Sequence, residues 1–164
     1  MPSSSTERPI AAGVQTHRKP ETVELRAAQP EDAQLLFEWR NDPITRAYSK
    51  TSRPISWEEH VVWYAQSLGN PDRLIFVAMA NGEPVGVIRG DREQAGWVLS
   101  WSIGSEHRGR GLLKLMIVAI FPHISGVVRA EIKADNNASI RAARSAGMTL
   151  RWRSNGLTHW VLDQ

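Results

Sequence analysis

The sequence predicts a mixed α/β domain built around a single β-sheet. Short alternating segments typical of strands are interspersed with longer segments in which apolar residues recur at helical spacing. Two Asn-Gly pairs, Asn81-Gly82 and Asn155-Gly156, each favour a tight hairpin between two strands. The expected order is a strand, two or three helices, three antiparallel strands, a helix, a strand, a helix and two strands. That order fits one sheet with helices packed against it.

Local signals set the boundaries of the first elements. A strand is expected at 22–28, and Pro30 suits the first turn of the helix that follows. Asn41-Asp42-Pro43 ends that helix, because a residue before proline disfavours the helical region. Ser56 to Glu59 forms a capping box, which opens a helix running to about Leu68. The later elements are expected as strands at 74–80, 84–91 and 97–103, a helix at 111–121, a strand at 127–134, a helix at 136–146, and strands at 148–153 and 158–162.

The helix that begins after Ser56 has two different faces. The apolar residues Val61, Ala65 and Leu68 have helical spacing, so we expect this stripe to face the core. The second stripe is aromatic and polar. It consists of His60, Trp63, Tyr64 and Ser67.

Composition limits the possible classes of function. The 164 residues are 41% hydrophobic and 23% charged, as expected for one globular domain at 21–164. The tail at 1–20 is rich in Ser, Thr and Pro, and we expect it to be disordered. The absence of cysteine excludes disulfides, thiolate metal sites and a cysteine nucleophile. We find no signal peptide and no apolar run that could span a bilayer, so a cytoplasmic protein without a membrane partner is expected.

The charge distribution argues against a nucleic-acid partner. The net charge is +3, and residues 1–20 contribute +2 of it through Arg8, Arg18 and Lys19 against Glu7. The remaining domain is therefore close to neutral, whereas a nucleic-acid-binding domain should be basic.

The segment Arg108-Gly109-Arg110-Gly111-Leu112-Leu113 lies between an expected strand and an expected helix. Glycines let backbone approach a ligand closely, and the first N–H groups of a helix lack partners, so the segment predicts a phosphate or pyrophosphate site. A nucleotide triphosphate loop would require Gly-Lys-Ser/Thr at its end. A dinucleotide loop would require a third glycine where Lys114 stands. The pyrophosphate loop of acyl-coenzyme A transferases is the third possibility.

The chain resembles the GNAT acetyltransferase superfamily over residues 22–163. The segment 108–113 fits the family's Arg/Gln-x-x-Gly-x-Gly/Ala loop, and 135–148 fits its Asn-x-x-Ser/Ala helix and the glycine after it. The resemblance implies a mostly antiparallel sheet, splayed at the coenzyme A site and flanked by about four helices. It also implies acetyl-CoA as co-substrate and no metal. The implied cofactor-binding residues are Ser102, Ile103, Arg108, Gly109, Arg110, Gly111, Leu112, Leu113, Asn136 and Ser139.

Two positions depart from the family's pattern. Leu113 replaces the small residue at the end of the loop, which predicts a weaker approach of backbone to pyrophosphate. Ala143 stands where the family often has a tyrosine that protonates the leaving thiolate. A thiol has a reference pKa of about 8.5, so the thiolate is a tolerable leaving group without that acid.

The N-terminal part is similar to a narrower branch of the family. Residues 37–43 with Arg46, and 55–60 with Trp63, resemble N-acetyltransferases of the pseudaminic-acid pathway type, which act on nucleotide-linked amino sugars. The resemblance implies transfer of an acetyl group to a primary amine of such a sugar. Arginine side chains suit phosphate oxygens. The implied substrate-binding residues are Arg40, Asn41, Arg46, Trp63 and Tyr64.

Three residues are candidates for the general base, because the strand at 97–103 has no carboxylate. They are Glu38, His60 and Glu131. Each also has a purely structural interpretation. Glu38 could form a helix-surface pair, His60 could pack beside Trp63, and Glu131 could form a cross-strand ion pair. Two other functions stay open. The acceptor could be a protein amino terminus or lysine, as in ribosomal-protein acetyltransferases, or the domain could bind acyl-CoA without catalysis. A homodimer also stays open.

Overall fold

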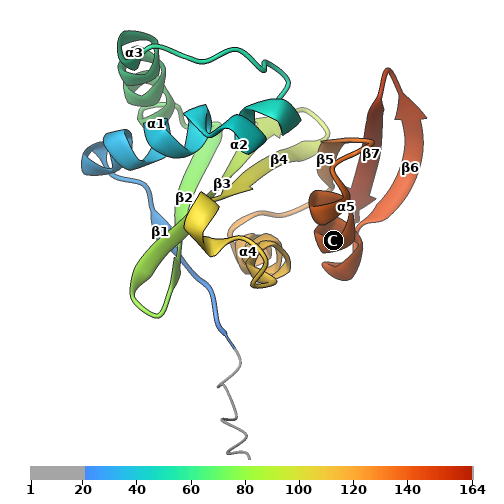
Figure 1. The fold of residues 1–164 in the computed structure, drawn as a ribbon. Helices are drawn as coiled ribbons and strands as arrows, with labels where there is room; N and C mark the ends of the chain where they lie inside the picture. The colour runs from blue at the N-terminus through green and yellow to red at the C-terminus, as the bar shows by residue number, and fades with distance from the viewer. Residues whose placement is uncertain (1–20, 164) are drawn as a thin grey trace, which may run out of the picture.

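The computed structural model describes residues 21–163, which form five α-helices around one seven-stranded sheet (Figure 1). The strands are β1 (Glu24–Ala27), β2 (Arg73–Ala80), β3 (Glu83–Glu93), β4 (Gly96–Ile103), β5 (Val128–Lys133), β6 (Thr149–Ser154) and β7 (Leu157–Leu162). The helices are α1 (Ala33–Asn41), α2 (Pro43–Tyr48), α3 (Trp57–Leu68), α4 (Leu112–Ile120) and α5 (Asn137–Ser145). The expected element order is confirmed. The expectation of a disordered tail at 1–20 lies outside the described residues.

The described part has five helices where about four were expected, because α2 is a separate helix. The Asp42 side chain accepts hydrogen bonds from the N–H groups of Ile44 (3.1 Å) and Thr45 (3.0 Å), and Pro43 fills the first helical position. The chain therefore ends one helix at Asn41 and starts another two residues later.

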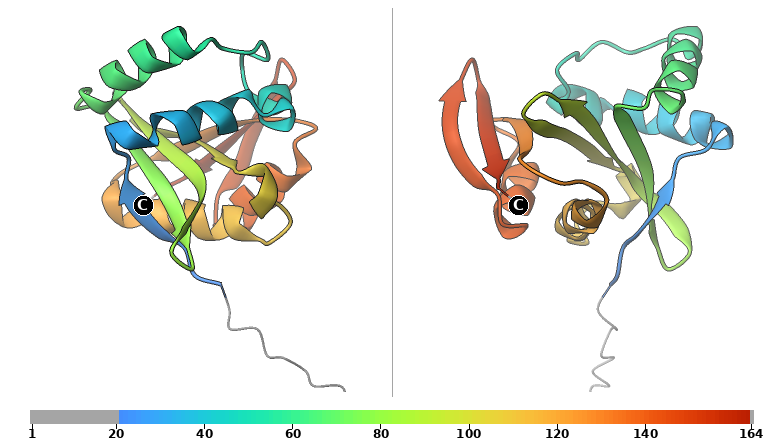
Figure 2. Two further views of the ribbon diagram at one scale, coloured as in Figure 1. Left: turned by 60° about the vertical axis from the view of Figure 1, so that its left-hand side comes forward. Right: turned by 180° about the vertical axis from the view of Figure 1, so that it is seen from behind.

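The sheet has the strand order β1-β2-β3-β4-β5-β7-β6, and only the β4–β5 pair is parallel. The helices α1, α2 and α3 cover one side, here called the front face, and α4 and α5 cover the back face (Figure 2). Both Asn-Gly hairpins are confirmed. Their turn residues all have positive φ, with Asn81 at 51° and Asn155 at 50°, as a type I′ turn requires.

Strands β4 and β5 pair over only three residues each. Trp97 to Leu99 lie beside Val128 to Ala130. Beyond these residues, β4 continues to Ile103 and β5 to Lys133 without pairing with each other. We call this divergence the fork. The expected splay of the sheet is thus confirmed, and the fork opens toward the carboxyl ends of both strands.

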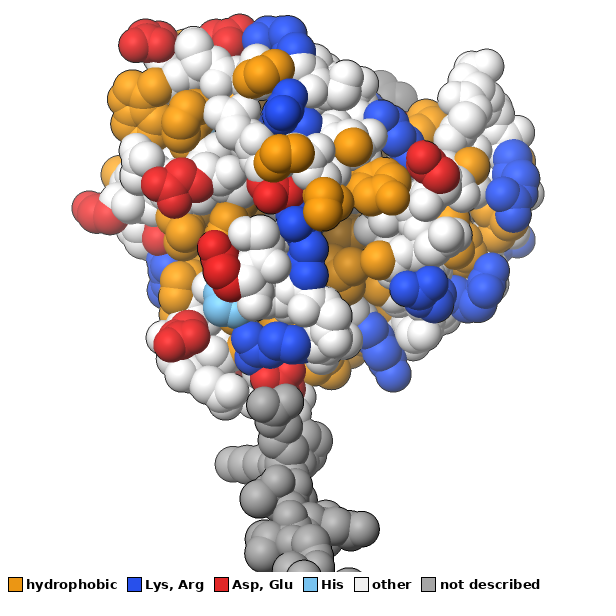
Figure 3. Space-filling view, viewed as in Figure 1, with side chains coloured by type: hydrophobic (Ala, Val, Ile, Leu, Met, Phe, Trp, Pro, Cys, Tyr) orange, Lys and Arg blue, Asp and Glu red, His pale blue; other side chains and the backbone are white. Residues whose placement is uncertain are grey.

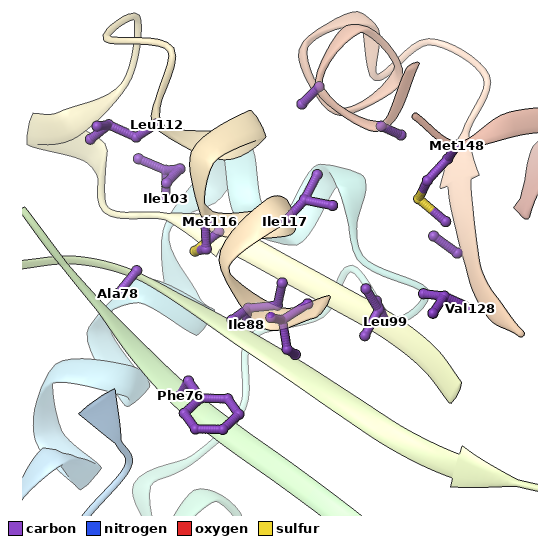
Figure 4. Close-up of a cluster of buried hydrophobic side chains, with 14 of the residues drawn as sticks. Phe76, Ala78, Ile88, Leu99, Ile103, Leu112, Met116, Ile117, Val128 and Met148 are labelled. Carbon is purple, nitrogen blue, oxygen red and sulfur yellow. The ribbon is translucent and has the colours of Figure 1, made fainter. Parts of the chain in front are cut away.

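The main core lies on the back face, between the sheet and helices α4 and α5 (Figure 4). Met116, Ile117 and Ile120 of α4 are completely buried, as expected for a helix that is apolar almost all round. They pack with Ile88 of β3 and Val128 of β5, which are also completely buried. Because α4 is the next α-helix after β4, this packing fixes the far end of the segment 104–111 that connects them.

The prediction for the two faces of α3 is wrong. The stripe of Val61, Ala65 and Leu68 is exposed, whereas His60, Tyr64 and Ser67 of the second stripe are buried. The residues that are buried belong to a second cluster on the front face, formed with α1 and β2.

Hydrogen bonds explain why polar side chains of α3 can be buried. His60 Nε2 donates to the carbonyl of Ala33 (2.7 Å), and the Tyr64 hydroxyl donates to the carbonyl of Gln29 (2.6 Å). Ser67 Oγ accepts from Arg73 Nη1 (2.8 Å). Burying a polar group is costly only when it loses its partner, so these contacts allow the polar stripe to face inward, although His60 Nδ1 has no hydrogen-bond partner within residues 21–163.

Among residues 21–163, no helix has the length and apolar character needed to cross a bilayer.

Gly96 is required at the closed end of the fork. Its φ is +128°, and a Cβ added there would lie 2.0 Å from the carbonyl oxygen of Val127. We expect Gly96→Ala to lower the free energy of unfolding by about 3 kcal/mol or more, because strain and overlap with backbone add. Chemical denaturation measures this. The matched control is Gly69→Ala, where the nearest atoms are 3.8 Å away and φ is −87°. Equal stability of the two variants would contradict this role of Gly96.

Candidate active site

The loop from Arg108 to Leu113 lies at the end of β4 and leads into α4. Gly109 has φ +76° and Gly111 has φ +74°, and a Cβ at either position would meet nothing within 4 Å. Packing therefore does not require these glycines, but the positive φ values do. Gly111 caps α4 without a side-chain hydrogen bond, so the first N–H groups of the helix are left for an anion.

The side chains after Gly111 point to the core. Leu112 is 2% exposed, and Leu113 is partly buried against the back-face core. The bulk of Leu113 is therefore taken up by packing, while its N–H stays in the first turn of α4. The Leu113 side chain therefore does not fill the space in front of the N-terminus of α4.

Both arginines of the loop are paired with carboxylates of the N-terminal part. Arg108 Nη2 donates to Asp42 Oδ1 and to Thr45 Oγ1 (3.2 Å). Arg110 donates from Nε to Glu21 (3.1 Å) and also contacts Glu21 through Nη2. Burial would raise the pKa of Asp42, but hydrogen bonds from Arg108 and from the N–H of Thr45 outweigh it and lower that pKa. The carboxylate is therefore ionised at neutral pH.

The other arm of the fork leads to α5. The Asn136 side chain accepts a hydrogen bond from the N–H of Ser139 (3.2 Å) and caps the helix. Ser139 Oγ accepts from Trp101 Nε1 of β4 (3.1 Å), so this contact joins β4 to α5 across the fork. Ala143 lies on the same face of α5 and is completely buried.

The cofactor residues expected from the sequence thus come together around the fork. Ser102 and Ile103 end β4, the loop 108–113 follows it, and Asn136 and Ser139 begin α5 after β5. In the space-filling view, which has the orientation of Figure 1, hydrophobic side chains line a recess near the centre of the molecule, with Lys and Arg side chains beside it (Figure 3). A surface hollow of about 810 Å³ lies elsewhere, at the β3–β4 turn and Arg129, on the closed side of the fork.

Four arginines on the front face interact electrostatically, and we call them the arginine cluster. They are Arg40, Arg46, Arg53 and Arg89. The pKa of Arg40 is lowered first by burial and then by the positive charges of the other three. Arg40 Nη2 donates to the carbonyl of Thr51 (2.8 Å), and its buried Nη1 has no hydrogen-bond partner within the described part of the chain.

Asn41 and Arg46, both expected to bind substrate, hold the segment between α2 and α3. The Asn41 amide donates to the carbonyl of Ile55 and accepts from its N–H, both at 2.9 Å. Arg46 donates to the carbonyls of Asn41 (3.1 Å) and Ser52 (3.2 Å). These contacts shape the segment that lies next to Arg40.

The two aromatic candidates have different environments. Trp63 is 37% exposed, and the guanidinium groups of Arg73 and Arg89 each lie 5.7 Å from its ring centroid. Tyr64 is 3% exposed, and burial raises the pKa of its hydroxyl to about 12. Trp63 is therefore the one whose ring is open to solvent.

The three candidate bases lie on three different elements of the fold. Glu131 is on β5 beside the fork, and its pKa is lowered chiefly by a hydrogen bond with Lys50, whose Nζ lies 2.6 Å away. Glu38 is exposed on α1 and accepts from Gln34 (2.9 Å). His60 is 1% exposed between α1 and α3, where burial lowers its pKa. Of the three, only Glu131 is next to the cofactor residues.

Sequence reasoning missed two residues near the site. Asp42 is the cap of α2 and the partner of Arg108, and its position before a proline is the signal for the cap. His159 of β7 pairs in register with Glu131, and its Nδ1 lies 3.9 Å from that carboxylate. No local signal marks His159, because the contact depends on the pairing of β5 with β7.

A family model and several solved structures match the chain over most of its length. Residues 22–149 match the family model described as "Acetyltransferase (GNAT) domain". The search of curated proteins gave no match.

Several solved structures share the fold. The aminoglycoside acetyltransferase AAC(6')-Ib with ribostamycin and coenzyme A has a TM-score of 0.73 at 19% identity, covering 87% of this chain and 94% of that one. The ribosomal L7/L12 α-N-protein acetyltransferase RimL with coenzyme A gives 0.73 at 17%, covering 87% and 94%. Spermidine N-acetyltransferase from Vibrio cholerae with coenzyme A and spermine gives 0.74 at 14%, covering 87% and 96%.

Burial of His60 predicts a dependence of stability on pH. Its folded-state pKa lies below the unfolded value of about 6.5, so folding favours the neutral ring. The stabilisation is complete above that unfolded value and is lost as the pH falls through it toward the folded pKa. We expect the thermal midpoint to fall less between pH 7.5 and pH 5.5 in His60→Gln than in the unaltered protein. The exposed His123, changed to Gln, is the control. An equal fall in all three proteins would contradict the prediction.

Proposed function

Because the chain belongs to the GNAT acetyltransferase family and is an acetyl-CoA-dependent N-acetyltransferase, we propose that its acceptor is a nucleotide-linked amino sugar. The observation that carries this proposal is the arginine cluster on the front face, with the half-buried Arg40 at its centre. The resemblance of residues 37–43 with Arg46, and of 55–60 with Trp63, to transferases of this type supports it.

The charges of the cluster favour an anionic acceptor. Arg53 has Glu59 as partner (2.7 Å), and Arg89 shares Asp91 with Arg73. No carboxylate pairs with Arg40 among the described residues, so its positive charge is partly buried without compensation. A diphosphate would supply the missing negative charge and hydrogen-bond acceptors. The same charges would repel a polyamine or a polycationic aminoglycoside.

The front face of the sheet leads from this cluster to the fork. Arg89 of β3 pairs in register with Ser100 of β4, and Val87 pairs with Ser102, so the two serines lie on the side of α1 and α2. A diphosphate held at Arg40 would therefore place an attached sugar over β4, next to the divergence from β5. This is the side from which we propose the amine approaches.

The residues around the fork suit acetyl-CoA. The N–H groups at the start of α4 would hold the pyrophosphate, and β4 from Ser102 with Asn136 and Ser139 of α5 would contact the pantetheine arm. Acetyl-CoA supplies an activated thioester, which a neutral amine attacks at its carbonyl carbon while the C–S bond breaks and the thiolate leaves. The chain must therefore orient the amine and remove its proton.

We assign the removal of the proton to Glu131. It lies on β5 immediately after the last residue paired with β4, and Lys50 keeps it ionised. An ionised carboxylate attracts the ammonium form of the acceptor and can accept its proton directly or through one water. On the neighbouring strand β7, His159 Nδ1 lies 3.9 Å from the Glu131 carboxylate.

Release of thiol from acetyl-CoA, measured with a panel of acceptors, tests the proposed substrate class. The panel contains UDP- and dTDP-linked amino sugars, the same sugars without a nucleotide, peptides and polyamines. We expect the nucleotide-linked sugars to have the highest kcat/KM. If peptides or polyamines react and the nucleotide-linked sugars do not, the proposed acceptor is wrong.

Arg40→Gln should weaken binding of the nucleotide-linked acceptor. Loss of charge-assisted hydrogen bonds of about 1.5–3 kcal/mol corresponds to a rise in KM of roughly 10- to 100-fold, whereas the KM for acetyl-CoA should not change. The control is Arg92→Gln, which removes an exposed charge near the β3–β4 turn. An unchanged KM in Arg40→Gln would remove the phosphate role.

Glu131→Gln should lower kcat by about 100-fold, because a general base typically contributes a factor of 10² to 10⁴. The KM for acetyl-CoA should stay within about twofold, since such a base acts on the acceptor. The comparison variant is Glu38→Gln on α1, and steady-state kinetics measure both. If Glu38→Gln loses activity and Glu131→Gln does not, the base is Glu38.

A further inference from the structure

The short helix α2 spans the fork on the front face and is attached to both arms. At its start, Arg108 of the phosphate-binding loop contacts Asp42 and Thr45. At its end, Lys133 of β5 donates to the carbonyl of Ala47 (2.7 Å). The α2 helix thus connects the segment after β4 with β5 at the place where these strands no longer pair.

We infer that Asp42 and Arg108 are positioning residues that couple occupancy of the phosphate-binding loop to the order of α2 and of the segment at 49–55. In this arrangement the protein binds its acceptor more tightly once coenzyme A is bound. The inference rests on the loop as the pyrophosphate site and does not depend on the chemical identity of the acceptor.

The geometry of Arg108 allows it to serve both sides. A guanidinium has five N–H donors, and the contacts of Arg108 to Asp42 and Thr45 both use Nη2. The other nitrogens can donate to a phosphate without breaking the pair with Asp42. A pyrophosphate would hold the arginine more firmly in place, and through Asp42 it would hold the start of α2.

The contact with α2 extends to the acceptor side. Asn41, next to Asp42, is hydrogen-bonded twice to Ile55, and Arg46 of α2 donates to the carbonyl of Ser52. The same segment supplies the carbonyl of Thr51 to Arg40. A change in the order of α2 would therefore also affect the arginine cluster, because both are hydrogen-bonded to backbone groups of the segment at 49–55.

The variant Asp42→Asn distinguishes the two roles of Asp42, which are to cap α2 and to pair with Arg108. Asparagine caps helices about as well as aspartate, so its side-chain oxygen can still accept from the N–H groups of Ile44 and Thr45. The change removes the negative charge that faces Arg108. A loss of coupling in this variant is thus not a loss of the helix.

Hydrogen exchange of the full chain, with and without coenzyme A, tests the inference. In the unaltered protein, coenzyme A should slow exchange in the loop 108–113 and, by about five- to tenfold, in α2, at the lower end of typical couplings between sites. In Asp42→Asn the loop should still be protected, while the effect on α2 should fall below about twofold. Thr45→Val keeps the Asp42–Arg108 pair, so it should keep the effect on α2.

Three results would overturn the inference. Coenzyme A could protect α2 equally in the unaltered protein and in Asp42→Asn. It could protect the loop but not α2 in the unaltered protein. It could protect neither segment, which would also remove the loop as its binding site. None of these outcomes depends on an acceptor, so each is distinguishable from a failure of the proposed substrate class.

Discussion

The short parallel ladder between β4 and β5 is the constraint on which the rest of the structure depends. The Trp97 N–H donates to the carbonyl of Val127 (2.8 Å), and three residue pairs follow before the strands separate. The sheet is continuous at one end and open at the other. Each arm then leads directly into a helix, α4 after β4 and α5 after β5, so both helix N-termini lie at the open end. In sheets with parallel strands, ligands bind at such carboxyl ends.

A fork of this kind needs support, because backbone groups along its inner edges have lost their neighbouring strand. Each arm is held from its other side: β4 pairs with β3 along its whole length, and β5 pairs with β7. On the back face, buried side chains of α4 pack against the sheet, and the Trp101–Ser139 hydrogen bond joins β4 to α5. On the front face, α2 makes the corresponding connection. The fork is thus held open by contacts on both faces.

The comparison with the sequence shows which features are local and which are not. Both hairpins were predicted because Asn-Gly fixes a turn by itself, and α4 was predicted because its residues are apolar on every side. The α3 faces were assigned wrongly because hydrophobic spacing assumes that apolar residues are buried. His60 and Tyr64 are buried because carbonyls of Ala33 and Gln29, far away in the sequence, accept their hydrogen bonds.

The same division between local and non-local features holds for the candidate site. The loop at 108–113 and the cap at Asn136 are continuous motifs whose chemistry is contained in a few adjacent residues, and the fold brings them to one place. The partners of these residues are distant. Asp42 reaches Arg108 across 66 positions and Lys133 reaches Ala47 across 86, and no short pattern records either contact. Spacing alone therefore gives the position of the proposed phosphate site but not the contacts that hold it in place.

The arginines of this chain show how the same side chain takes different roles according to its partners. In the loop, the positive charges of Arg108 and Arg110 are largely compensated by carboxylates, although the nitrogens of Arg108 that do not contact Asp42 can still donate hydrogen bonds to a phosphate. The attraction for an anion at the loop then depends mainly on the N–H groups of α4, which suits a ligand that must be released as product after each turnover. Arg40 has no such carboxylate among the described residues, and its charge acts on whatever enters the front face. The distribution of carboxylates, more than that of arginines, therefore distinguishes the proposed cofactor side of the fork from the proposed acceptor side.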